Sequence, residues 1–225
     1  MNPIVIGGTG GSGTRLVAEI LQAAGVFIGK ELNYALDALP YARLDDNYLN
    51  GKVITADRVK VAEEEHGVRV CPPARWGWKH TRSLLTLPML HGSYPSMFLV
   101  HVIRDGRDLA YAPHFGMPVL WNGYMPKFYA SPEVVIMQWS TTNMQAENYG
   151  KSYLDGYFMV KYEDLVNKPL RTIEGLYGAL KLSGADASSA VGLCRNPGSI
   201  GRWRGKIDQR TQEIGETALG RFNYI

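Results

Sequence analysis

Residues 4–14 read IVIGGTGGSGT, and the fold class can be inferred from this stretch. It opens with the β-branched run Ile4–Ile6, which is typical of a buried parallel strand. Five glycines follow within residues 7–13, which predicts a tight loop. From Thr14 onward, apolar positions recur on one face of a helix that Gly25 is suited to end. The chain therefore begins with a strand, a glycine-rich loop and a helix.

A loop in this position favours an anionic ligand, because backbone amides and the positive end of the helix converge there. Gly8, Gly10 and Gly13 satisfy the dinucleotide pattern G-x-G-x-x-G, and the same span satisfies the start of a Walker loop, G-x-x-x-x-G. Thr14 stands where a Walker loop has lysine, which argues against a nucleoside triphosphatase. No acidic residue follows a convincing second strand, so an NAD(P)-dependent Rossmann oxidoreductase stays only as an alternative.

Strands and helices continue to alternate along the chain. Further apolar strands are predicted at 98–103 and 157–162, and a shorter one ends near residue 79. Helices are predicted at 134–148 and 170–182. This alternation predicts an α/β fold, with a central parallel sheet and helices on both faces.

Composition excludes several classes of protein. The 225 residues suit one domain, and 45% hydrophobic with 20% charged residues is typical of a soluble globular protein. The net charge, 24 − 21 = +3, is too small to indicate nucleic-acid binding. No apolar stretch approaches the roughly 18 to 20 residues of a membrane span. Cys71 and Cys194 cannot form a disulfide framework, so we expect a cytoplasmic protein.

Four motifs resemble, in order, those of the sulfotransferases that use 3′-phosphoadenosine 5′-phosphosulfate (PAPS). They are Ser12-Gly13-Thr14 in its glycine loop, FLVHVIRDGRD at 98–108, VKYEDLVNKP at 160–169 and GRWRG at 201–205. The resemblance covers most of the chain. It implies a single P-loop-like α/β domain over residues 1–225 and transfer of a sulfonate group from PAPS to a hydroxyl or amine, leaving adenosine 3′,5′-bisphosphate.

The resemblance also implies a role for each matching residue in binding the donor. Those expected to hold the 5′-phosphosulfate, within the loop 7–15, are Gly10, Gly11, Ser12, Gly13, Thr14 and Arg15. Arg104 matches the arginine that holds the 3′-phosphate, and Tyr162 matches the tyrosine that contacts adenine. Arg202 and Arg204 belong to a late basic loop at 195–207, which completes the predicted donor site.

Two positions depart from the family pattern. Many members have lysine or arginine where this chain has Gly11, and the nearest replacement is Arg15. The serine usually found eight residues after the 3′-phosphate arginine is Ala112 here. Arg107, Arg202 or Arg204 could compensate. A nucleotide-binding protein without catalytic activity therefore stays as a further alternative.

The predicted catalytic residues are His80, Lys79 and Arg15. The segment WGWKHTR at 76–82 predicts a strand that ends at Lys79 and His80, where the family carries a lysine and a histidine. In many members the histidine is two residues after the lysine, whereas here His80 follows Lys79 directly and Thr81 takes the later position. We expect His80 to accept the acceptor's proton, with His114 in reserve. No metal ligands are expected.

Two loops are predicted to form the acceptor pocket, namely 30–44 and 111–131, both of which hold aromatic side chains. A small molecule or a carbohydrate is the expected acceptor. Its identity and the oligomeric state are not determined by the sequence.

Overall fold

The computed structural model describes residues 2–69, 73–112 and 131–225. Its centre is a parallel sheet in the order β2-β1-β3-β4. The strands are β1 (Ile4–Gly8), β2 (Gly77–Lys79), β3 (Phe98–Ile103) and β4 (Gly156–Lys161). Ile4 of β1 pairs with Phe98 on one side and with Gly77 on the other. All four strands run in one direction, so their carboxyl ends form one edge of the sheet. The α/β class and the parallel sheet are confirmed.

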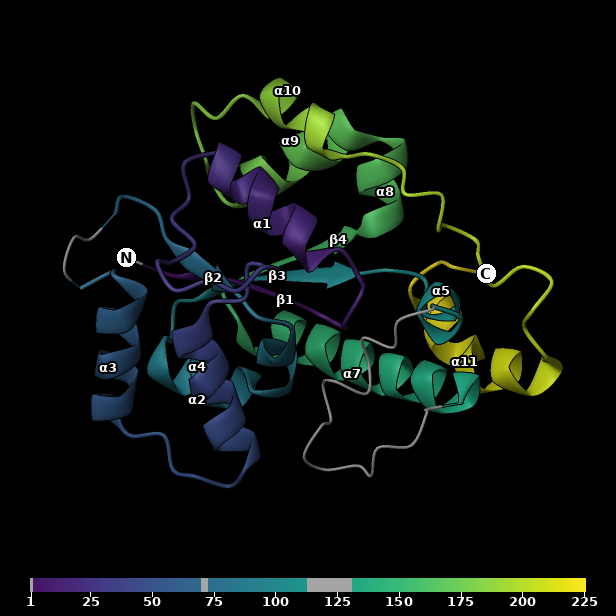
Figure 1. Ribbon diagram of the computed structural model, residues 1–225, viewed down its shortest axis with the longest axis horizontal. Helices are drawn as coiled ribbons and strands as arrows, with labels where there is room; N and C mark the ends of the chain where they lie inside the picture. Colours follow the sequence, from purple (N-terminus) through teal and green to yellow (C-terminus); the bar gives the residue numbers. More distant parts are fainter. Residues whose placement is uncertain (1, 70–72, 113–130) are drawn as a thin grey trace.

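Helices cover both faces of this sheet (Figure 1). One layer holds α1 (Thr14–Ala23), α8 (Tyr162–Asn167), α9 (Pro169–Ala179), α10 (Ala187–Ala190) and the short helix η2 (Val191–Leu193). The other holds α2 (Leu39–Leu49), α3 (Ala56–His66), η1 (Thr81–Leu85), α4 (Leu87–Ser93) and α7 (Pro132–Tyr153). The short helix α5 (Gly106–Ala110) and the last helix α11 (Gln209–Arg221) pack at the end of α7.

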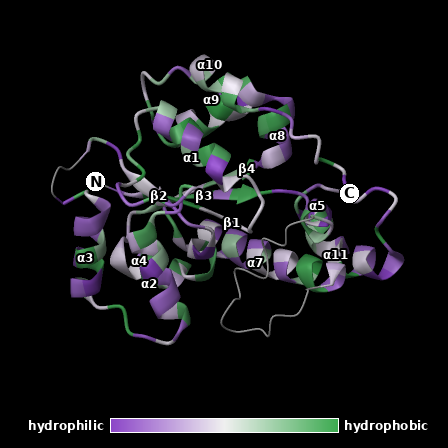
Figure 2. Cartoon of the chain, viewed as in Figure 1, coloured by the Kyte–Doolittle hydropathy of each residue, from purple (hydrophilic) through white to green (hydrophobic). Residues whose placement is uncertain are grey.

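Successive side chains of a strand point to opposite faces of the sheet, and this alternation explains the two layers. Ile4 and Ile6 pack into a core with α1, α8 and α9, whereas Val5 between them packs into a second core with α2, η1 and α4. In β3, Val100 joins the first core and Leu99 the second. Figure 2 shows α3, which lies on the outside of its layer, as largely hydrophilic. The sheet is therefore buried on both faces and hydrophobic along its strands.

The helix and strand boundaries differ from the sequence predictions in a few places. The helix predicted at 134–148 extends over Pro132–Tyr153, and the one predicted at 170–182 ends at Ala179. The fourth strand ends at Lys161, because Tyr162 begins α8.

The segment 30–44 is not a loop throughout, because α2 begins at Leu39 with Pro40 in its first turn. The sequence did not predict this helix because of the polar composition of α2. Of the predicted acceptor segment 111–131, residues 113–130, including His114, lie outside the described residues. Within the described ranges, no helix combines the length and hydropathy needed to cross a bilayer.

Candidate active site

The carboxyl edge of the sheet brings the predicted site residues together. The glycine loop follows β1, His80 follows Lys79 at the end of β2, Arg104 follows β3, and Tyr162 follows β4. Because neighbouring parallel strands lie about 4.8 Å apart, residues that follow them lie close together at this edge. The N-terminus of α1 lies at the same edge, and the backbone amides of its first turn favour an anion.

The glycine loop needs its glycines for backbone conformation and for space. Gly11 and Gly13 have φ angles of 83° and 93°, in the left-handed region. A Cβ on Gly8 would stand 2.5 Å from the carbonyl oxygen of Val102, so β3 leaves no room for a side chain there. The turn is closed by the Ser12 amide, which donates to the Thr9 carbonyl at 3.0 Å. These features form a compact backbone cradle.

Tyr162 packs directly against this cradle. A Cβ on Gly13 would lie 2.3 Å from Cδ2 of the Tyr162 ring. The guanidinium of Arg104 lies over the same ring, with 4.7 Å between Cζ and the ring centroid. Arg104 Nη1 also donates to the Gly11 carbonyl at 3.5 Å. One contact group is therefore formed by Gly11, Gly13, Arg104 and Tyr162.

Arg104 also reaches the late basic loop. Its Nη2 donates to the carbonyl and to Oγ of Ser199, both at 2.9 Å, and lies 3.4 Å from Oδ2 of Asp108. That carboxylate oxygen accepts from the Gly201 amide at 3.0 Å. Arg104 Nε and Asp108 Oδ1 are buried without a partner among the described residues. A donor and an acceptor left unsatisfied in this way are expected where a polar ligand binds.

The two arginines of the late basic loop, Arg202 and Arg204, have different surroundings. Arg202 donates from Nε to the Ser199 carbonyl at 3.1 Å, and burial followed by the positive charge of Arg104 lowers its pKa. Arg204 is exposed and lies near the Trp203 ring, 5.9 Å from its centroid. The structure therefore brings Arg202, and not Arg204, to Arg104.

Arg107 is an ion-paired structural residue. Its guanidinium binds Asp105 at 2.8 Å, stacks on Trp203 at 3.9 Å and donates to the Tyr224 carbonyl at 2.8 Å. With only 4% of its surface exposed, it fastens the late loop and the C-terminal residues to the turn after β3. These contacts give Arg107 a structural role, and its part in compensating for Ala112 stays a prediction.

Arg15 occupies the first turn of α1. Its side chain is 60% exposed and pairs with Glu19 at 2.9 Å. Its positive charge also lowers the pKa of Lys79, although burial of that lysine is the larger cause. Arg15 is therefore placed toward the end of β2, on the rim of the site.

Lys79 is buried and bound to the loop that precedes α2. Its Nζ lies 2.7 Å from Asp37 Oδ1 and donates to the Ala35 carbonyl at 3.1 Å. Asn33 Oδ1 closes the same loop by accepting from the amides of Ala35 and Asp37. At the tip of this loop, Tyr34 is 90% exposed. Lys79 thus attaches part of the predicted acceptor segment to the sheet edge.

His80 has a partner that sequence analysis missed. Its Nδ1 lies 2.6 Å from Oδ2 of Asp45, a residue of α2 with no exposed surface. Ser83 Oγ donates to the same oxygen at 2.8 Å, and Thr86 Oγ1 donates to Oδ1 at 2.5 Å. A sequence could have suggested Asp45 only through a general expectation that a catalytic histidine has a carboxylate partner.

Two other histidines are structural. His101 is fully buried between Tyr157 and Asn143, and burial lowers its pKa to about 4. His66 packs among aromatic rings and contacts the Gly77 carbonyl, and burial lowers its pKa to about 4 as well. No group of three or more histidine, cysteine, aspartate or glutamate residues able to hold a metal ion occurs in the described part of the chain.

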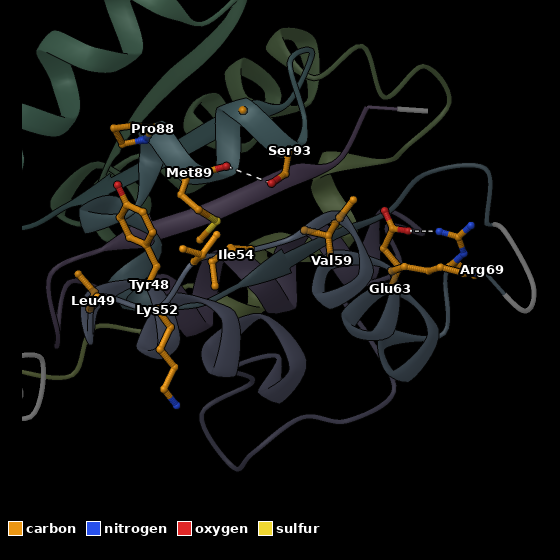
Figure 3. A pocket seen from close by; sticks show the side chains of 15 residues that line it. Tyr48, Leu49, Lys52, Ile54, Val59, Glu63, Arg69, Pro88, Met89 and Ser93 are labelled. Atoms are coloured by element: carbon orange, nitrogen blue, oxygen red, sulfur yellow. Dashed lines mark hydrogen bonds and ion pairs between the residues drawn. The ribbon is translucent and has the colours of Figure 1, made fainter.

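A separate groove of about 1120 Å³ lies between α2, α3 and α4. Figure 3 shows Ile54 and Met89 pointing into it, Lys52 pointing away, and Glu63 paired with Arg69 at one end. The lining residues include none of the glycine loop and none of the residues that follow the four strands. The groove is therefore not part of the donor site.

Comparison with known proteins gives the class of this fold and site. A family model described as the sulfotransferase family matches residues 3–186, so the chain belongs to that family. This membership removes the support for the Rossmann oxidoreductase alternative. A search of curated proteins gives no match.

Solved structures agree on the fold. Sulfotransferase STF1 from Mycobacterium tuberculosis is similar with a TM-score of 0.58 and 16% identity, covering 100% of this chain and 77% of the other. Sulfotransferase STF9 from Mycobacterium avium has a TM-score of 0.56 and 12% identity, covering 99% of this chain and 76% of the other.

Proposed function

We propose that this sulfotransferase takes its sulfonate group from PAPS and transfers it to a hydroxyl or amine of a small-molecule or carbohydrate acceptor. The observation that carries the proposal is the group formed by the glycine loop, Arg104, Tyr162 and Ser199. It combines an anion cradle, an aromatic ring and a guanidinium in one contact group. PAPS presents three matching groups, namely the 5′-phosphosulfate for the cradle, adenine for the aromatic ring and the 3′-phosphate for the guanidinium.

The loop from Gly10 to Arg15 receives the 5′-phosphosulfate in this proposal. Amides at the start of α1 point to one anion, and a side chain at Gly8 or Gly13 would collide with neighbouring residues. Arg15 supplies a cation that the family usually has at the position of Gly11. Its surface pair with Glu19 is worth less than about 1 kcal/mol, so turning toward the sulfonate costs little.

Arg104 and Arg202 receive the 3′-phosphate. Burial and then the positive charge of Arg104 lower the pKa of Arg202, so a dianion between the two guanidinium groups is favoured. Ser199 supplies the hydroxyl missing at Ala112, because its Oγ already lies 2.9 Å from Arg104 Nη2. Tyr162 supplies a face for adenine, while Arg204 contributes positive charge from the rim.

His80 acts as the general base in the transfer. The acceptor oxygen or nitrogen bonds to the sulfonate sulfur as the bond from sulfur to the phosphate oxygen breaks, and its proton passes to Nε2 of His80. Lys79 holds the loop at residues 33–38 and has one further N–H beyond its two contacts, which can stabilise the negative charge of the sulfonate.

A thermal-shift comparison of adenosine 3′,5′-bisphosphate, NAD(P) and ATP at equal concentrations tests the donor. At 100 times its Kd a ligand adds about 2.7 kcal/mol to the free energy of unfolding, so only the bisphosphate should raise Tm by several degrees. No stabilisation by millimolar bisphosphate would refute the proposal. Transfer from PAPS to a panel of phenols, alcohols, amines and sugars then separates an enzyme from a nucleotide-binding protein without activity.

A further inference from the structure

Asp45 presents a buried carboxylate without any exposed surface, which is costly unless it is fully hydrogen-bonded. Its neighbours Ser83 and Thr86 satisfy this need with two hydroxyl donors, at 2.8 and 2.5 Å. The remaining contact is with His80 Nδ1, at 2.6 Å. Within residues 2–69, 73–112 and 131–225, Asp45 contacts His80 and forms no ion pair with arginine or lysine.

The direction of these hydrogen bonds defines the state of the histidine ring. An ionised carboxylate only accepts hydrogen bonds, so the contact requires the proton to sit on Nδ1 of His80. The other nitrogen, Nε2, then carries the lone pair. Nε2 has no hydrogen-bond partner in the part of the chain that the structure describes, and the His80 side chain is 9% exposed. The ring therefore has a basic nitrogen free for a substrate proton.

The backbone of His80 is also held in place. The His80 amide donates to the Ile6 carbonyl at 3.1 Å, which continues the pairing of β2 with β1. His80 has an extended conformation and caps η1, the helix that also supplies Ser83. The strand end, η1 and α2 thus meet at the His80–Asp45 pair.

We propose that Asp45 is a positioning residue, which sets the tautomer and orientation of His80 and stabilises its cation once the proton arrives. This inference rests on the proposed function, in which His80 is the base. Asp45 does not touch the substrate. Its negative charge lies on the far side of the imidazole, where it compensates the positive charge that the ring gains during transfer.

The tautomer is tested first, on the unmodified protein, by nitrogen-15 NMR of the histidine rings. At a pH where His80 is neutral, we expect a protonated Nδ1 and an unprotonated Nε2 for this residue. The assignment comes from loss of the signal in His80→Gln. An Nε2–H tautomer would overturn the proposal, and this readout does not depend on any activity.

The Asp45→Asn variant tests the kinetic consequence. The amide keeps the size of the side chain but removes its charge, so kcat should fall by roughly 10² to 10⁴. The acceptor KM and the Kd for adenosine 3′,5′-bisphosphate should change less than threefold. An unchanged kcat would refute the positioning role. If Asp45→Asn does not fold, the NMR result on the unmodified protein decides alone.

Ser83→Ala is the matched control. It removes one donor to Asp45 but leaves the His80–Asp45 contact, so its kcat should fall less than tenfold. A loss equal to that of Asp45→Asn would indicate a structural role and overturn the proposal. Failure of the unmodified protein to bind the bisphosphate or to transfer sulfonate from PAPS would refute the proposed function instead, while leaving the tautomer measurement interpretable.

Discussion

The ring of Tyr162 fills the space where Gly13 would carry a side chain. The two residues are 149 positions apart in the numbering, yet a Cβ on Gly13 would stand only 2.3 Å from Cδ2 of the ring. The start of α1 and the start of α8 are thus in contact at the predicted donor site. An added methyl group must displace the ring or unwind the loop.

The first prediction concerns this contact. Gly13→Ala should weaken binding of adenosine 3′,5′-bisphosphate at least 30-fold, because a left-handed φ of 93° and a collision act together. Isothermal titration measures the Kd. Gly178→Ala is the control: it adds the same methyl group to α9 in open space and should leave the Kd unchanged while stabilising the fold by up to about 1 kcal/mol. Equal affinity of both variants would contradict the prediction.

The second prediction concerns the 3′-phosphate. Arg104→Lys keeps the charge but loses the planar fork, and it should raise the Kd for the bisphosphate at least tenfold. Ser199→Ala removes one hydrogen bond with a charged group, worth about 1.5 kcal/mol or more, so it should raise the Kd at least tenfold. Adenosine 5′-phosphate, which lacks the 3′-phosphate, should bind both variants and the unmodified protein equally. Arg171→Lys, an exposed change on α9, serves as the control.

The third prediction concerns the cation at the rim. Arg15→Ala should lower kcat about tenfold with little change in the Kd for the bisphosphate, because that product lacks the sulfonate. Glu19→Gln releases Arg15 from its surface pair and should alter the free energy of unfolding by less than about 1 kcal/mol, without loss of kcat. Undiminished turnover in Arg15→Ala would remove Arg15 from the mechanism.

The fourth prediction concerns stability against pH. Burial lowers the pKa of His66 and of His101 to about 4, from an ordinary value of 6.5. Between these values the unfolded chain binds protons that the folded protein does not, so the free energy of unfolding falls as the pH falls. From pH 7 to pH 5 the loss should be about 2 kcal/mol per histidine. Urea unfolding across this range measures it.

His101→Gln separates the two contributions. Glutamine can still bond Tyr157 and Asn143 but does not titrate, so the pH dependence of the free energy of unfolding should fall by roughly half. A pH dependence equal to that of the unmodified protein would show that His101 does not resist protonation in the folded state.

Much of the fold could be predicted because its signals are local. The strand at 98–103 is a continuous apolar run that ends at a charged residue, and the observed β3 has the same bounds. The glycine loop combines a strand, glycines and an amphipathic helix within 20 consecutive residues. Such patterns depend on neighbours in the chain, so a single sequence reveals them.

The partners of the site residues were not predictable in the same way. Asp45 lies 35 residues before His80, on a helix whose buried face includes this carboxylate and so lacks a clear apolar stripe. Ser199 lies 95 residues after Arg104, in an irregular segment without periodicity. Nothing in the sequence distinguishes Asp45 from its neighbour Asp46, which pairs with Arg82 instead. The packing of α2 against η1 determines that Asp45, and not Asp46, contacts His80.

The contact between Arg104 and Asp108 has a consequence for turnover. The carboxylate lies 3.4 Å from Nη2 and is tied to the amide of Gly201, so the guanidinium is preorganised by an internal counterion. In the proposed function, an arriving phosphate exchanges with this weak contact, and little side-chain entropy is lost on capture. When the bisphosphate departs, Asp108 is already in place to neutralise Arg104 again. We therefore expect the same aspartate to limit the affinity for the nucleotide product and to speed its release.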